Sequence, residues 1–475
     1  MTSSAPPIIW WIRRDLRLAD NTVLEAIAAK GRAVVPVYVF DEHERALGAA
    51  AKWRLGQGLH ALQQRLQGLG LGLTLTTGDA LQAFQKLCAE TGADAVYWSR
   101  LYDPEAIERD TKVKAGLKAQ GVEARSYAGR MLFEPWTVET KTGGAFKVFT
   151  PFWKAVRGRE VASLTDAPRS LRGLDHWPRS LTFEDLDFSS PMNRGAAVLA
   201  RYCEVGEEVA LRKLSDFCDQ SLASYNESRN ILAAQATSDL SDHLAWGEVS
   251  PLRLWSVGQA GLARGLAGAE QFCKEVIWRE FATHLVYHTP QMISQNWRPD
   301  WDAFSWQDGQ GDDVLRWQQG QTGFDLIDAA MRELYTTGKM HNRARMVVAS
   351  FLCKHMMINW KIGAGWFRDC LVDWDPASNA MGWQWVAGSG PDAAPFFRIF
   401  NPETQRTTYD GSGNYCRRWL AEGQEAPPQT ALDFFEAIPR RWCLSAQQQR
   451  CQTMLDLAAG RARALEAYQA LRQNS

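Results

Sequence analysis

The segment DWDPASNAMGWQW (373–385) gathers acidic, amide and indole side chains in one short stretch. Neither the 3.6-residue period of an amphipathic helix nor the two-residue period of a strand fits it, so core packing alone is a poor account of it. The whole chain shares this bias, with 21 Trp against 11 Tyr. The first candidates for a functional site are therefore Asp373, Asp375, Asn379, Trp383 and Trp385.

A second candidate lies in KEVIWREF (274–281), where Glu275, Trp278 and Arg279 stand at i, i+3 and i+4. On a helix these three side chains share one face, beside an apolar stripe. Many i,i+4 ion pairs are only surface features. Taken alone, the pattern therefore favours an interfacial Trp next to a solvated Glu–Arg pair.

The residues that follow Gly338 form a third candidate, because Gly338 is placed to end one helix. Asn342 is a natural N-cap for the next helix, whose first turn then holds Arg343, Arg345 and Met346. Exposed N–H groups and two Arg favour an anion, Asn can read the edge of a base, and Met offers an adaptable apolar surface. A capped helix with a solvated Arg pair is the alternative, and it is the more common arrangement.

Three hydroxyl side chains precede or begin another expected helix, at Thr237, Ser238 and Ser241. Hydroxyls together with free N–H groups can hold a phosphate without a Gly-rich loop. Ser and Thr are also ordinary N-caps, so this signal is weak by itself. Tyr225 and Arg229 are further candidates, as the aromatic and basic wall of a cofactor site.

Composition and missing motifs exclude several classes of function. The net charge is −1, so any anion-binding surface has to be local. No H-E-x-x-H motif occurs among the eight His, so we expect no metal site. Neither a G-x-S-x-G elbow nor a phosphate-binding lysine loop occurs. The nine Cys include no C-x-x-C pair, and no apolar run is long enough to span a bilayer. We therefore expect a cytoplasmic monomer with no membrane partner.

The elements that must position these residues fall into two parts. Short apolar or β-branched runs predict strands at 8–12, 33–40, 71–78, 93–99 and 122–127, with helices at about 22–29, 50–68, 80–91 and 104–119. This alternation predicts βαβ units around a parallel sheet, although no G-x-G-x-x-G follows the first strand. From about 197 onward helical spacing takes over. We predict an α/β domain (1–135), a long linker (136–196) and a large helical domain (197–475).

Several segments together resemble the cryptochrome/photolyase family. WWIRRDLRLADNTVL, TSDLS, EVIWREF, MHNRARM and WQW…GSGPDAAPFFRIFNP occur in the order and spacing of that family. The resemblance extends from about residue 8 to about residue 440. It implies an α/β domain that binds an antenna pigment and a helical domain that holds FAD in a U-shaped conformation.

The resemblance also implies roles for single residues. The implied FAD contacts are Tyr225, Thr237, Ser238, Leu240, Ser241, Arg345, Asp373, Asp375 and Asn379, with Arg345 placed to pair with Asp373. The implied contacts to a DNA lesion are Glu275, Trp278, Asn342, Arg343, Met346 and Trp385, and those near DNA phosphates are Arg229, Arg279 and Arg398. An electron relay to the flavin is implied for Trp383, Trp360 and Trp306.

Three positions indicate the branch of the family. Asn342 and Met346 resemble photolyases that repair cyclobutane pyrimidine dimers, because (6-4) photolyases typically carry a His in place of Asn342. Asn379 stands where plant cryptochromes place Asp. YWSRLYDPEAIERD and AWGEVSP resemble the class III, plant-cryptochrome-like enzymes.

The resemblance thus implies light-driven electron transfer from reduced FAD (FADH⁻) to dimers flipped out of DNA, and the alternative is a signalling blue-light photoreceptor. For the antenna, 5,10-methenyltetrahydrofolate is the first choice and a deazaflavin the second.

Overall fold

The N-terminal part of the chain is a five-stranded parallel sheet in the order β3-β2-β1-β4-β5. The computed structural model describes all residues except 1–4, 193–194, 308, 310, 394 and 475. The strands are β1 (Ile8–Ile12), β2 (Val34–Phe40), β3 (Thr74–Thr77), β4 (Ala95–Ser99) and β5 (Glu123–Tyr127). All five predicted strands are confirmed, and in β1 to β4 β-branched and aromatic residues make the strand recognisable from local sequence.

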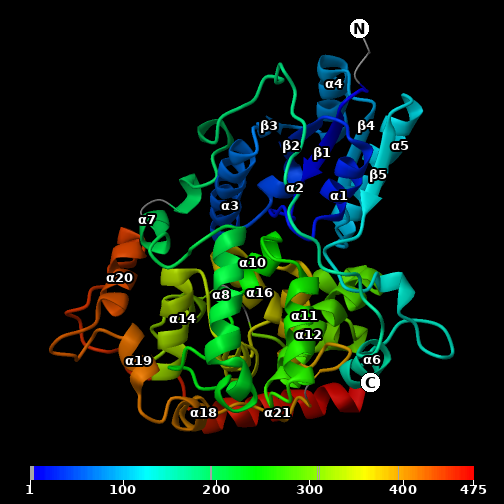
Figure 1. Cartoon of the computed structure of the whole chain (residues 1–475). Helices are drawn as coiled ribbons and strands as arrows, with labels where there is room; N and C mark the ends of the chain where they lie inside the picture. The colour runs from blue at the N-terminus through cyan, green and yellow to red at the C-terminus, as the bar shows by residue number, and fades with distance from the viewer. Residues whose placement is uncertain (1–4, 193–194, 308, 310, 394, 475) are drawn as a thin grey trace.

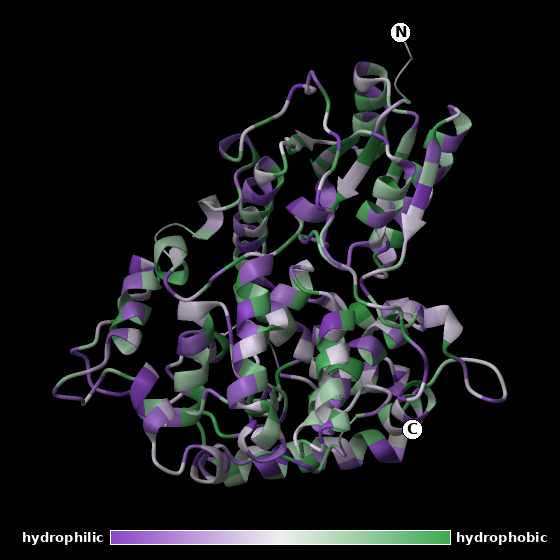
Figure 2. Ribbon diagram, viewed as in Figure 1, coloured by the Kyte–Doolittle hydropathy of each residue, from purple (hydrophilic) through white to green (hydrophobic). Residues whose placement is uncertain are grey.

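Helices cover both faces of this sheet, so the central strands are buried on both sides. Ile8, Trp10 and Ile12 pack with α1 (Thr22–Lys30) and α3 (Ala49–Gly68). The alternate residues Ile9 and Trp11 pack on the opposite face with α4 (Ala80–Thr91) and α5 (Pro104–Ala119). A short helix, α2 (Glu42–Arg45), follows β2. Figure 2 shows the resulting hydrophobic strands at the centre of the sheet.

From α7 onward the chain is largely helical and lies below the sheet in Figure 1. Its helices are α7 (Gly195–Leu199), α8 (Glu207–Gln220), α9 (Tyr225–Ser228), α10 (Ser241–Trp246), α11 (Pro251–Ala263), α12 (Ala269–His288), α13 (Asp312–Gln318), α14 (Asp325–Thr337), α15 (Asn342–Ser350), α16 (Trp360–Cys370), α17 (Pro376–Ala387), α18 (Pro402–Tyr409), α19 (Asn414–Trp419), α20 (Gln429–Ala437) and α21 (Leu457–Asn474). None of the helices in the described part of the chain is both long and apolar enough to cross a membrane.

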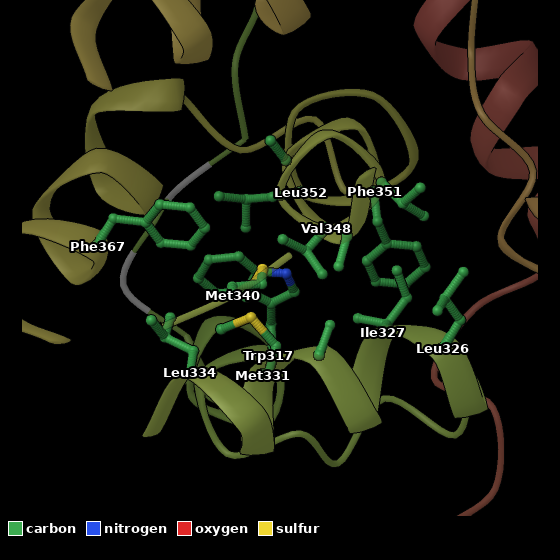
Figure 3. Close-up of a cluster of buried hydrophobic side chains, with 14 of the residues drawn as sticks. Trp317, Leu326, Ile327, Met331, Leu334, Met340, Val348, Phe351, Leu352 and Phe367 are labelled. Atoms are coloured by element: carbon green, nitrogen blue, oxygen red, sulfur yellow. The ribbon is translucent and has the colours of Figure 1, made fainter. Parts of the chain in front are cut away.

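The core of the helical part forms where α14 packs against α15 and the π-helical turn Phe351–His355 that continues it. Ile327, Met331 and Leu334 form an apolar stripe along α14, and Gly338 ends this helix at φ 67°, as predicted. Figure 3 shows this stripe facing side chains from several other elements, among them Trp317, Val348, Phe351, Leu352 and Phe367. This core fixes the start of α15 and one side of α16, which carry several candidate site residues.

The predicted linker (136–196) contains more structure than a connector needs. It includes α6 (Phe149–Val156), whose Phe152 packs against Phe281 of α12 at a centroid distance of 5.2 Å. After α6 the described residues before α7 form only two short 3-10 turns, Glu184–Leu186 and Ser190–Met192, and a bridge between Ala33 and Arg172 ties this stretch to the sheet. Residues 193 and 194 of this segment lie outside the described residues. The domain bounds themselves stay a prediction.

A buried ion network holds the two parts together. Arg54 of α3 donates to both carboxylate oxygens of Glu248 at 2.8 and 2.6 Å, and to Asp242 at 3.1 Å. All three side chains are fully buried. Burying such charges is costly unless every one of them is paired, so this interface tolerates little relative movement of the parts.

Candidate functional site

The segment 373–385 begins as an extended loop and continues as α17. The side chain of Asp375 caps this helix by accepting the backbone N–H of Ser378 at 2.8 Å, and Pro376 occupies the first turn. Asn379 and Trp383 are buried on one face of α17, at i and i+4, and Gln384 is buried on another side of the helix. The segment shows no amphipathic period because the helix is buried nearly all round.

Arg345 and Asp373 form the ion pair that the sequence predicts. Arg345 Nη2 donates to Asp373 Oδ2 at 2.7 Å, and its Nε donates to the carbonyl of Met340 at 2.8 Å. Asp373 is 6% exposed, and its other oxygen, Oδ1, is buried without a hydrogen-bond partner among the described residues. An unsatisfied buried carboxylate oxygen is costly, so this atom is a natural acceptor for a donor on a bound ligand.

Asn379 is held close to that pair along the chain, on the first turns of α17. Its Nδ2 donates to the backbone carbonyl of Asp375 at 3.0 Å, and the side chain is 8% exposed. The carboxylate of Asp375 is turned toward the α/β part, with Oδ2 3.7 Å from Arg130 Nη2. Burial alone raises the pKa of Asp375, but the charges of Arg279 and Arg130 outweigh it, so the pKa lies below its usual value.

The start of α15 differs from the prediction in one respect. His341, and not Asn342, is the N-cap, because its Nδ1 accepts the backbone N–H of Arg343 at 3.1 Å. Burial lowers the pKa of His341 to about 4, so the ring is neutral and able to accept at neutral pH. Asn342 is consequently the first residue of the helix, and its exposed side chain is left for other partners.

The loop with the three hydroxyls is tied to the segment that precedes α15. Asp239 has φ 49° and its carboxylate pairs with Lys213 at 2.6 Å and with Lys339 at 2.9 Å. Thr237 and Ser241 are exposed, Ser238 is half-buried and Leu240 is buried. The structure therefore brings the predicted phosphate-binding loop next to the chain that leads into Asn342.

Three arginines that are predicted to contact DNA, Arg229, Arg343 and Arg398, lie near enough to one another for their charges to interact, and they are called the cationic cluster below. Burial lowers the pKa of Arg343, and the charges of Arg229 and Arg398 act in the same direction. Arg343 lies over the ring of Tyr409 at 4.4 Å and donates to Asn230 Oδ1 at 3.0 Å. A chain with a net charge of −1 thus has a local concentration of positive charge.

Glu275 and Arg279 do not pair with each other on α12. Glu275 Oε1 lies 2.5 Å from Arg229 Nη1 and also accepts Gln271 Nε2 at 2.7 Å. Arg279 donates to the backbone carbonyl of Arg130 at 2.9 Å and lines a cavity between the two parts of the molecule. In the free protein the guanidinium of Arg279 thus contacts the α/β part, and its contact with a DNA phosphate stays a prediction.

The aromatic and apolar side chains predicted to touch a substrate are partly open to solvent. Trp278 is half-buried and stacks on Phe149 of α6, with ring centroids 3.6 Å apart and 6° between the planes. Met346 and Trp385 are also half-buried. Tyr225 is 7% exposed and packs edge-on against Phe217 at 5.4 Å. Phe149 was not predicted from the sequence, because it lies in the predicted linker and no spacing pattern marks it.

The three tryptophans of the predicted relay lie in or beside the helical core. Trp383 is 3% exposed and packs edge-on against Phe367 at 4.9 Å. Trp360 is 1% exposed, and its Nε1 donates to Asn296 at 2.8 Å. Trp306 is half-buried and contacts Phe304 at 4.5 Å. Asn296 and Trp317, which lies 6.5 Å from Trp383, were not predicted from the sequence, because no local pattern marks either contact.

Two hollows lie where the α/β part meets the helical part. The inner cavity measures about 20 Å³ and is lined by charged side chains, among them Arg14, Asp103, Arg130, Arg279 and Asp375. Burial lowers the pKa of Arg130 to about 9, and Arg279 and Arg14 act in the same direction. The outer groove measures about 250 Å³ and is lined by Tyr102, Pro104, Ile107, Glu108, Val286, Tyr287 and Pro290.

Comparison with known proteins agrees with this geometry. The family model described as DNA photolyase matches residues 8–169, and the one described as the FAD binding domain of DNA photolyase matches residues 272–470. A deoxyribodipyrimidine photo-lyase of Agrobacterium fabrum is 42% identical over 100% of both chains. The second family model covers most of α12 and all of α15 and α17, and it includes the Arg345–Asp373 pair and most of the predicted site.

Two solved structures resemble the whole chain. A bacterial class III photolyase from Agrobacterium tumefaciens has a TM-score of 0.91 at 42% identity, covering 100% of this chain and 99% of that one. A cryptochrome from Synechocystis has a TM-score of 0.84 at 28% identity, covering 98% of this chain and 100% of that one. The full-length identity to a photo-lyase, together with both family models, shows that this chain belongs to the DNA photolyase family.

Proposed function

We propose that this protein repairs cyclobutane pyrimidine dimers in DNA by light-driven electron transfer from bound, reduced FAD. The observation that carries the proposal is the first turn of α15. Arg343 belongs to the cationic cluster, whereas Arg345, two residues later, pairs with buried Asp373. One rigid turn of helix thus joins an anion-binding surface to an acceptor inside the protein.

The residues around Asp373 fit a flavin. Arg345 neutralises the carboxylate and leaves Asp373 Oδ1 free to accept from an N–H or O–H group of the cofactor. The hydroxyls at 237–241, tied to the same region through Lys339, suit its phosphates. When bound, reduced FAD supplies the electron that light makes available for splitting the dimer. Asn379 contributes a neutral amide there, where a carboxylate would repel an anionic flavin.

The surface residues supply the recognition of the lesion. Arg229, Arg343 and Arg398 contact phosphates, so affinity falls as salt rises. A dimer has to leave the base stack to approach the flavin, and its weakened stacking and pairing makes it cheaper to extrude than an intact pair. Trp278 and Trp385 then wall the extruded dimer, Met346 adapts to its apolar side, and Asn342 and Glu275 bond its polar edges.

The outer groove is the site that we propose for the antenna pigment, and a folate is the pigment that we favour. Tyr102 and Tyr287 line the groove, and Trp136 lies 6.3 Å and 5.5 Å from their rings. These aromatic faces suit a flat, bicyclic pterin better than a larger tricyclic deazaflavin. The inner cavity of about 20 Å³ holds no more than about one water. Mass spectrometry of pigment extracted from wild type and from Tyr287→Ala tests this, and an unchanged pigment content in the variant contradicts it.

The repair assay uses a duplex with one thymine dimer, pre-reduced holoprotein, and matched samples in light and darkness. Light-dependent loss of the dimer supports repair. A protein that holds FAD and absorbs light, yet leaves the dimer intact, contradicts repair and favours the photoreceptor alternative.

Asp373→Asn keeps the shape of the side chain but removes its charge from Arg345, so it should lower the FAD content of the purified protein. We propose that the protein is located in the cytoplasm, because its nine cysteines are free and a reducing compartment keeps thiols free. We also propose that it is a monomer, which size-exclusion chromatography tests.

A further inference from the structure

Two side chains that we assign to different parts of the DNA are bound to each other in the free protein. Arg229, which follows α9, is assigned to a phosphate, and Glu275 of α12 is assigned to the edge of the dimer. Their charged atoms Nη1 and Oε1 lie only 2.5 Å apart. The side chains are 18% and 29% exposed, so the pair lies at the rim of the protein and DNA can reach it.

The neighbours of the pair hold it in place without replacing either partner. The guanidinium of Arg229 lies 5.5 Å from the centroid of the Tyr225 ring, which limits its movement. Gln271 donates to the same oxygen of Glu275 at 2.7 Å, but it is uncharged. If Arg229 turns to a phosphate, Glu275 therefore keeps one weak donor and loses its only counter-charge among the contacts that the structure describes.

We propose that the Arg229–Glu275 ion pair makes the protein discriminate against undamaged DNA, an inference that rests on the proposed repair function. A phosphate competes for Arg229 in any DNA. In undamaged DNA the pyrimidines stay stacked, so the carboxylate of Glu275 gains no new donor when Arg229 leaves it. The loss of the ion pair then opposes binding. An extruded dimer presents the imide N–H groups of its pyrimidine rings, and these replace Arg229 as donors to Glu275.

The same groups thus serve both specificity and affinity. With a dimer, both members of the pair exchange one partner for another, so opening the pair costs little. Without a dimer, only Arg229 gains a partner. Discrimination of this kind works by penalising the wrong ligand, in addition to rewarding the right one.

A double-mutant cycle on the holoprotein tests this. The four proteins are wild type, Glu275→Gln, Arg229→Ala and the double variant. Their dissociation constants are measured in the dark, at one fixed salt concentration, for a duplex with one thymine dimer and for the same duplex undamaged. FAD content and Tm are compared for each variant, and Arg229→Gln closes the cycle if Arg229→Ala lowers either of them.

Glu275→Gln should bind undamaged DNA about three- to tenfold more tightly than wild type does, and bind the dimer more weakly. Arg229→Ala should weaken binding to both duplexes. In the Arg229→Ala background, Glu275→Gln should leave affinity for undamaged DNA unchanged, because no pair is left to break. Equal tightening by Glu275→Gln in both backgrounds overturns the proposal, and so does no tightening in the wild-type background.

The matched control is Glu227→Gln, an exposed carboxylate on α9 that lies two residues from Arg229. It removes the same charge from the neighbourhood, so an effect on undamaged DNA equal to that of Glu275→Gln would mean general electrostatics and overturn the proposal. Failure of the underlying function is distinguishable: a wild type that neither prefers the dimer nor repairs it in light contradicts the repair proposal. A wild type that repairs dimers but gives an additive cycle contradicts only the role of the pair.

Discussion

Gly363 faces the indole of Trp383 so closely that a Cβ added at position 363 would lie 2.1 Å from Cη2 of the ring. Gly363 follows Trp360 by nearly one turn of α16, so this contact joins the helix of one relay tryptophan to the ring of another. Only a residue without a side chain allows this approach.

Gly363→Ala should therefore displace Trp383 and slow the photoreduction of oxidised flavin. Overpacking of this kind typically costs about 1–3 kcal/mol of stability. Gly365→Ala is the matched control on the same helix, because none of the atoms that the structure describes lies within 4 Å of its added Cβ. The readouts are Tm and the rate of flavin photoreduction with an external reductant. Equal rates in the two variants would contradict a role for the position of Trp383.

Trp383→Phe tests the relay itself. Phe keeps most of the packing against Phe367, but it is a much poorer electron donor, so the variant should fold and bind FAD yet fail to photoreduce oxidised flavin. Supplied with reduced flavin, it should still repair dimers, because repair does not pass through the relay. Trp317→Phe is the control, since Trp317 is fully buried, lies 6.5 Å from Trp383 and is outside the predicted relay. Normal photoreduction in Trp383→Phe rules out the relay assignment, and loss of folding favours a packing role.

Asn379→Asp should make the flavin harder to hold in its reduced, anionic form. Two unit charges about 5 Å apart at an effective dielectric constant of about 20 repel by roughly 3 kcal/mol. The carboxylate would also meet the carbonyl of Asp375, where the amide of Asn379 now donates at 3.0 Å. Redox titration should therefore show a lower flavin reduction potential, with less repair in aerobic light. Ser378→Asp adds the same charge to α17 one residue earlier, and an equal shift in both variants would contradict a specific effect at position 379.

Whether a feature of the fold or of the site can be predicted from the sequence depends on how far apart along the chain the interacting residues lie. The five strands and the end of α14 at Gly338 are set by local sequence, and the prediction placed them correctly. Spacing on α12 suggested Arg279 as the partner of Glu275, but the partner is Arg229, which immediately follows α9. Arg279 is drawn away by Arg130 of the N-terminal part, a contact between distant segments that no local rule contains. The inner cavity and the outer groove were missed for the same reason.

The cap of α15 was mispredicted because Asn is the commoner N-cap, whereas here the His341 ring accepts the N–H of Arg343. This cap should be sensitive to acid. Burial lowers the pKa of His341 from 6.5 to about 4 in the folded protein, so the unfolded chain binds the proton more readily between these values. Stability from this group is therefore fully present above about pH 6.5 and is lost as pH falls toward 4. The loss amounts to at most about 2 kcal/mol once partial exposure is allowed for.

His341→Asn keeps an acceptor at the cap but does not titrate, so its Tm should fall less than that of wild type between pH 7 and pH 4.5. Parallel Tm curves for the two proteins would show that His341 does not titrate across folding.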